Sequence, residues 1–171
     1  MSSRWCLKCY VNQIANVKAT QQLNKVMARA LTLPNATVEF STTVKDLGVE
    51  LDSQLTMADH IVALSRSCFF YIRQLSSMRQ SLTPDAVKTL VYAFVSSCID
   101  YCNCILAGVS GQLLQRLHSV QNAAARLVTG ARRSDSMTPI LHQLHWLPVR
   151  QRIIFQTAVL VYKCLHGMAP P

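Results

Sequence analysis

Acidic residues are scarce in this chain. Eight of its 171 residues are Asp or Glu, against 17 that are Lys or Arg, so the formal net charge at pH 7 is +9. No two aspartates are adjacent, whereas metal-dependent nucleotidyl transfer needs clustered carboxylates to hold its ions. We therefore expect the chain alone to be no enzyme.

Common motifs of catalytic and cofactor sites are also missing. The sequence has no G-x-x-x-x-G-K-[ST], G-x-G-x-x-G, H-E-x-x-H or G-x-S-x-G. Cys6 and Cys9 have the spacing of half a zinc site, but no second pair follows at a suitable distance. His142 and His145 can share one helix face, yet further ligands are lacking, which favours a core or turn role. We predict no metal and no cofactor.

Long apolar runs are absent as well. No stretch of roughly 18 uncharged apolar residues occurs, which argues against a membrane span. The N-terminal MSSRWCLKCY is not followed by an apolar segment, so it does not resemble a signal peptide. The seven cysteines are odd in number, and we interpret them as reduced thiols of an intracellular protein, nuclear or cytoplasmic.

Positive charge, by contrast, is plentiful in the last third of the chain. From Ser110 onward there are seven basic residues and one acid, Asp135. Such asymmetry indicates a polyanionic partner, nucleic acid or an anionic surface. The alternative is a soluble protein that is merely basic.

Periodicity predicts a mainly α protein, a helical bundle preceded by a short β-hairpin. Residues 1–30 are poorly defined, with a helix expected over 18–30. Residues 31–55 alternate apolar and polar positions, and Gly48 falls inside the second expected strand, where glycine marks a bulge or a close backbone approach. Residues 56–171 carry apolar residues at spacings of three and four, which predicts helices.

Residue types mark the expected helix boundaries. Thr56 begins a capping-box-like start, Thr83-Pro84 begins a second helix, and Ser110 caps a third. Gly130 ends the third helix, and Thr138-Pro139 can start another. The second helix should be central, since it has an apolar stripe of Val87, Leu90, Val91, Phe94, Cys98, Tyr101, Cys102 and Ile105. The last helix, from about 149 to 166, has an apolar stripe of Ile153, Ile154, Val161, Cys164 and Leu165.

Several stretches occur in a specific order: VKDLGVELDSQLTMADHI (44–61), YCN (101–103), QNAAARLVTGARR (121–133), TPILHQLHWLPVRQRI (138–153) and VYKCLHGMAPP (161–171). Together they resemble the region behind the polymerase palm in LINE-type, non-LTR retrotransposon reverse transcriptases. The resemblance covers roughly residues 21–171, and the first 20 residues match poorly.

The resemblance implies a fragment of an RNA-directed DNA polymerase. Residues 31–55 would correspond to the primer-grip hairpin, and 56–171 to the thumb and its truncated C-terminal continuation. The thumb of such enzymes lies against the primer–template duplex. The palm, with its [YF]-x-D-D motif, and the fingers would lie upstream of residue 1, so they are missing partners.

Charge and resemblance together define a set of candidate nucleic-acid-binding residues. They are Lys45, Gly48, Arg66, Arg73, Arg126, Arg132, Arg133, Arg150 and Arg152. Arginines on a helical bundle suit phosphate contacts, which position a duplex without reading its sequence. We thus expect a non-catalytic fragment that contacts an RNA–DNA or DNA duplex and no membrane. The alternatives are a helical protein-interaction module, or a relic polypeptide without a selected function.

Overall fold

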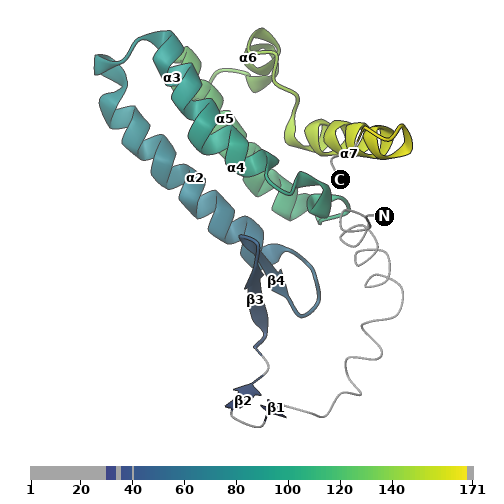
Figure 1. The fold of residues 1–171 in the computed structure, drawn as a ribbon. Helices are drawn as coiled ribbons and strands as arrows, with labels where there is room; N and C mark the ends of the chain where they lie inside the picture. The colour runs from purple at the N-terminus through teal and green to yellow at the C-terminus, as the bar shows by residue number, and fades with distance from the viewer. Residues whose placement is uncertain (1–29, 34–35, 40, 169–171) are drawn as a thin grey trace. The chain divides into compact units, whose positions relative to one another are not determined.

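The computed structural model describes residues 30–168, apart from residues 34, 35 and 40. The Cys6–Cys9 pair and residues 18–29 of the expected N-terminal helix lie outside the described residues. Helices dominate the described part of the chain, and short antiparallel strands precede them (Figure 1). The predicted fold class, mainly α with an N-terminal hairpin, is confirmed.

The strands form two hairpins where the sequence predicts one. β1 (Ala30–Leu33) pairs with β2 (Ala36–Glu39), and β3 (Thr43–Asp46) pairs with β4 (Val49–Asp52), both antiparallel. The expectation that Gly48 lies inside a strand is wrong. Leu47 and Gly48 form the two-residue turn between β3 and β4, with φ of 46° and 81°. Positive φ at both central residues is the geometry of a type I′ turn, which glycine adopts without strain.

Asp52 fixes the chain between β4 and the first long helix. Its Oδ1 accepts hydrogen bonds from the backbone N–H groups of Gln54 and Thr56, both at 2.9 Å, and its Oδ2 accepts one from the Thr56 hydroxyl at 2.9 Å. Partial burial raises the pKa of Asp52, but the hydrogen bonds outweigh it, and the net pKa lies below 3.8. The Thr56 hydroxyl also accepts from Ala58 N at 3.3 Å, where α2 begins.

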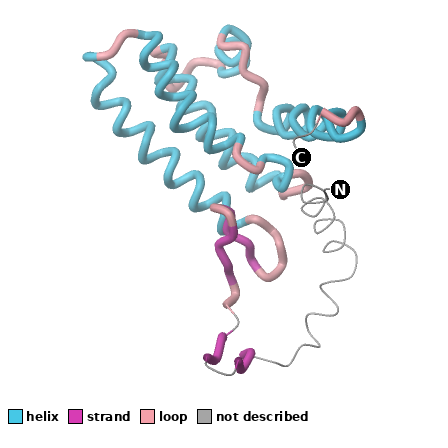
Figure 2. The backbone as a smooth tube through the Cα atoms, in the orientation of Figure 1, coloured by secondary structure: helices cyan, strands magenta, loops and turns pink. Residues whose placement is uncertain are grey.

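The described chain divides into two compact units, one ending at Asp59 and one beginning at His60. Figure 2 shows the succession of helices through the second. The helical elements are α2 (Ala58–Met78), the 3-10 turn Arg79–Ser81, α3 (Pro84–Val91), the π-helical segment Tyr92–Ser96, α4 (Ser97–Asp100), the 3-10 turn Asn103–Leu106, α5 (Gly111–Thr129), α6 (Met137–Gln143) and α7 (Val149–Leu165).

Local capping explains several of these boundaries. The Thr83 hydroxyl accepts from Ala86 N at 3.3 Å, and the Ser110 hydroxyl accepts from Leu113 N at 3.5 Å, as predicted. The start of α6 differs from the prediction. Its N-cap is Ser136 rather than Thr138.

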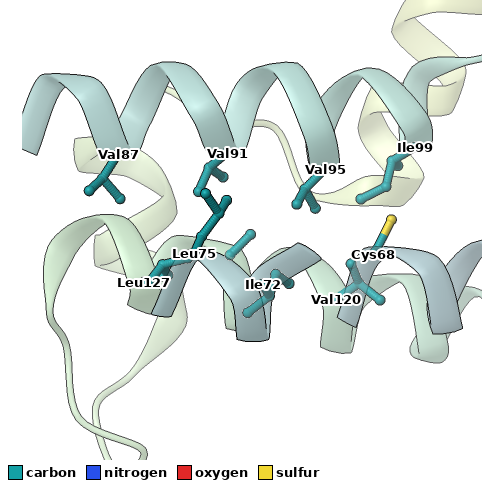
Figure 3. Close-up of a cluster of buried hydrophobic side chains, with 10 residues drawn as sticks. Cys68, Ile72, Leu75, Val87, Val91, Val95, Ile99, Val120 and Leu127 are labelled. Carbon is teal, nitrogen blue, oxygen red and sulfur yellow. The ribbon is translucent and has the colours of Figure 1, made fainter. Parts of the chain in front are cut away.

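Three helical segments bury one apolar core in the second unit. α3, the π-helical segment and α4 follow one another without a break and form one helical rod, the α3–α4 rod. The core consists of Cys68, Ile72 and Leu75 of α2, Val87, Val91, Val95 and Ile99 of the α3–α4 rod, and Val120, Ala124 and Leu127 of α5. Figure 3 shows the row from Val87 to Ile99 projecting from one helical rod toward side chains of the other two helices. Burial, together with nearby Cys98, raises the pKa of the Cys68 thiol to about 12, so this cysteine remains protonated.

The π-helical segment corrects the predicted stripe of the second helix. A regular helix would bring Phe94 to the core, but one π turn inserts about one extra residue and rotates the following side chains. The buried row consequently advances by four residues each time, through Val91, Val95 and Ile99. Phe94 is 44% exposed and lies against Tyr71, with ring centroids 5.4 Å apart.

Two aspartate substitutions test which side chains of the π-helical segment face the core. Val95→Asp should abolish cooperative thermal unfolding, because Val95 is fully buried and an unpaired carboxylate there cannot be solvated. Phe94→Asp should retain a cooperative transition, with a lowered melting temperature from the lost Tyr71 contact. Thermal unfolding of the two variants, followed by circular dichroism, measures the difference. A less stable Phe94→Asp than Val95→Asp would contradict the π turn.

Candidate nucleic-acid interface

The turn that follows α5 is held by short local hydrogen bonds. Gly130 has φ of 76°, and its N–H donates to the carbonyl of Arg126 at 2.8 Å. Asp135 Oδ2 accepts from the backbone N–H of Arg132 at 2.6 Å, and Asp135 N donates to the carbonyl of Arg132 at 3.2 Å. The backbone that carries Arg132 and Arg133 is therefore ordered by the chain itself.

Arg126 braces the same turn from the last part of α5. Its Nε donates to the carbonyl of Arg132 and its Nη2 to the carbonyl of Arg133, both at 3.4 Å. Arg126 is half-buried, whereas the residues it braces are exposed. The side chains of Arg132 and Arg133 thus extend from a turn whose shape Arg126 supports.

Arg79, which lies just after α2, joins these residues although it is distant in sequence. A Cβ added at Gly130 would lie 2.8 Å from Nη2 of Arg79, so this guanidinium rests against the glycine. The guanidinium of Arg79 therefore lies at the carboxyl end of α5, where the helix dipole favours a positive charge. We call Arg79, Arg126, Arg132 and Arg133 the arginine cluster. Sequence reasoning omitted Arg79 from the candidate site; its place near the end of a predicted helix was the available signal.

Arg152 has a different role from the one expected. Its Nε lies 2.6 Å from Asp100 Oδ1, and its Nη2 donates to Asp100 Oδ2 at 2.6 Å. Both side chains are largely buried, with exposed fractions of 16% and 19%. This two-point ion pair joins α7 to the end of α4, so the guanidinium of Arg152 is engaged within the fold.

The other candidates lie on other elements of the chain. Arg66 and Arg73 are exposed on α2, seven residues apart and therefore on one helix face. Arg150 is exposed in the first turn of α7. Lys45, exposed in β3 opposite Glu50, and Gly48 belong to the first unit.

Neither a metal centre nor a membrane-spanning helix is found in the part of the chain that the structure describes. No group of three or more His, Cys, Asp or Glu there could hold an ion, and His142 and His145 are exposed on and just after α6. No described helix is both long and apolar enough to cross a bilayer.

Comparison of the chain with protein families, curated proteins and solved structures found no match. The resemblance to LINE-type reverse transcriptases therefore rests on the sequence stretches that carry it.

Three glycine substitutions test the geometry of the cluster. Gly130→Ala should cost about 1–2 kcal/mol of unfolding free energy for the left-handed backbone, because the flexible end of the Arg79 side chain can move aside at little further cost. Gly108→Ala carries the backbone cost alone, because φ is 88° but nothing lies within 4 Å. Gly111→Ala, with an open surrounding and no positive φ, should be near neutral. Urea unfolding measures all three, and a Gly130→Ala effect as small as that of Gly111→Ala would contradict the left-handed backbone at Gly130.

Two neighbouring arginines of α7 should differ in stability effect. Arg152→Ala strands the largely buried Asp100 carboxylate and should lower the free energy of unfolding by about 1–3 kcal/mol. Arg150→Ala, a matched exposed change on the same helix, should stay within about 0.5 kcal/mol. Urea unfolding at pH 7 checks the difference; similar small effects for both would show that the ion pair is not formed in solution.

Proposed function

We propose that this chain binds the phosphate backbone of a nucleic-acid duplex through the arginine cluster and catalyses no reaction. The observation that carries the proposal is the convergence of Arg79, Arg126, Arg132 and Arg133 on one ordered turn. Guanidinium groups present donors in a planar fork that matches phosphate oxygens. A turn ordered before binding loses less conformational entropy when it meets its ligand.

Local charge supports the same role. Asp135 is the only acid in the sequence after Asp100, and its carboxylate accepts from a backbone N–H within the turn. The cluster therefore keeps an excess of positive charge. Arg66 and Arg73 add a second exposed pair, spaced roughly 10 Å apart along α2 by the helical rise. Contacts of this kind fix the position of a duplex and carry no sequence information.

The resemblance to a reverse-transcriptase thumb suggests which duplex is bound. Primer and template form an RNA–DNA hybrid or a DNA duplex, and we propose this pair as the ligand class. The competing explanation is that the arginines merely compensate the dipole at the carboxyl end of α5. Arg79 and Arg126 fit that explanation, since they lie against the turn itself. Arg132 and Arg133 are exposed in the turn, so their removal distinguishes phosphate binding from compensation of the helix dipole.

Removal of two exposed cluster arginines tests the proposal. Arg132→Ala with Arg133→Ala should weaken binding to two unrelated duplexes equally. The plot of log affinity against log salt should become shallower by about two units, since each phosphate contact contributes roughly 0.9. Fluorescence anisotropy over a salt series measures both quantities.

A charge-matched variant separates the cluster from net charge. Arg116→Ala with Lys163→Ala also removes two exposed positive charges, but from elsewhere on α5 and α7. We expect this control to lower the affinity only slightly and to keep the wild-type slope. Equal slopes in all three proteins, or equal losses in both double variants, would refute binding through the cluster.

A further inference from the structure

Helix α7 leaves most of its apolar residues uncovered. Of the apolar stripe Ile153, Ile154, Val161, Cys164 and Leu165 that the sequence predicts for this helix, only Ile153 is buried. Ile154, Val161 and Leu165 are 62%, 50% and 79% exposed. Exposed apolar side chains in one contiguous patch mark interaction sites on folded proteins.

These side chains form one wall of a groove. The other wall comprises Leu106 at the end of the 3-10 segment, Val109 in the loop after it, and Leu114 in the first turn of α5. The space has a volume of about 680 Å³, and its α7 wall runs from Arg150 to Leu165. Fifteen residues of helical rise are roughly 22 Å, enough for about four turns of a docked helix.

Polar contacts outside the groove hold its walls in place. Arg152 pairs with Asp100 at 2.6 Å, and Asn103 Nδ2 donates to Gln156 Oε1 at 3.2 Å. Gln121 Nε2 donates to the carbonyl of Leu147 at 2.8 Å, which fixes the segment before α7 to α5. The groove is thus formed before any partner arrives.

Charge indicates which occupant the groove suits. Neither α5 nor α7 contains an acid, and the one charged residue on the lining is Arg150, beside the positive end of the α7 dipole. Asp135 lies past the far end of α5, roughly 28 Å of helix away, and Asp100 is engaged by Arg152. A second copy of this basic chain would bring like charges together, which is costly at an interface.

We propose that this groove docks an amphipathic helix of a partner protein, with apolar residues facing α7 and an acidic residue facing Arg150. Helices in grooves use apolar anchors at positions i, i+3 or i+4, and i+7. The function is distinct from nucleic-acid binding. The groove lining is mainly apolar and lacks the arginine cluster.

A designed 18-residue helical peptide tests the proposal with the full chain. One version carries Leu at the anchor positions and Glu at the end that would face Arg150; a second carries Lys in place of Glu; a third has Ser in place of Leu. Fluorescence anisotropy should show saturable binding of the Glu peptide, about tenfold weaker binding of the Lys peptide, and none of the Ser peptide.

Matched protein variants locate the binding site. Val161→Ser with Leu165→Ser should weaken the Glu peptide at least about tenfold without unfolding the chain, since both residues are exposed. Phe155→Ser, an equally exposed position of α7 outside the lining, should bind as wild type. Arg150→Glu should reverse the preference between the Glu and Lys peptides.

Other occupants give distinct results that overturn the proposal. A concentration-dependent dimer in light scattering, dissociated by Val161→Ser with Leu165→Ser, would assign the groove to a second copy. Sedimentation with phosphatidylserine vesicles that the same variant abolishes, without peptide binding, would assign it to a membrane surface. Displacement of the Glu peptide by duplex would make the groove part of the nucleic-acid surface.

Discussion

The structure of the second unit depends on one packing contact, the insertion of the row Val87, Val91, Val95 and Ile99 between α2 and α5. The row has no charged member and is continuous across a π-helical turn. Because this contact aligns the two long helices, the end of α2 meets the end of α5. The juxtaposition of Arg79 with Gly130, and therefore the arginine cluster, follows from apolar packing rather than from any attraction among the arginines, which repel one another.

Two of the three acids in the described part of this unit serve its own fold. Asp100 binds the guanidinium of Arg152, and Asp135 accepts from the backbone of its turn. These two carboxylates are therefore occupied by contacts within the unit, and most of its basic side chains remain exposed at the surface. The two proposed surfaces differ in polarity and charge. The arginine cluster is polar and cationic, whereas the α7 groove is apolar with a single cationic residue on its lining.

Much of the fold can be predicted from local sequence signals. Caps at Thr83 and Ser110, the left-handed Gly130 and the apolar spacing of α5 all depend on residues within a few positions of one another. The sequence-based predictions fail where contacts between distant residues, or a local change in helix type, determine where a side chain lies. A π turn shifts the phase at Phe94, Arg152 is recruited by an acid 52 residues away, and Arg79 reaches the site only through tertiary packing. Periodicity also cannot say whether an apolar face finds a partner, as the exposed residues of α7 show.

The central claim is that the turn after α5 touches nucleic acid, and a photo-crosslink tests it most directly. A benzophenone side chain placed at Ser134, exposed among the cluster arginines, should crosslink to a bound RNA–DNA hybrid without removing any arginine. The same group at Gln112, exposed at the opposite end of α5, should give little product. Salt should reduce the Ser134 crosslink in parallel with binding. Equal crosslinking at both positions, or crosslinking at Gln112 alone, would contradict the account.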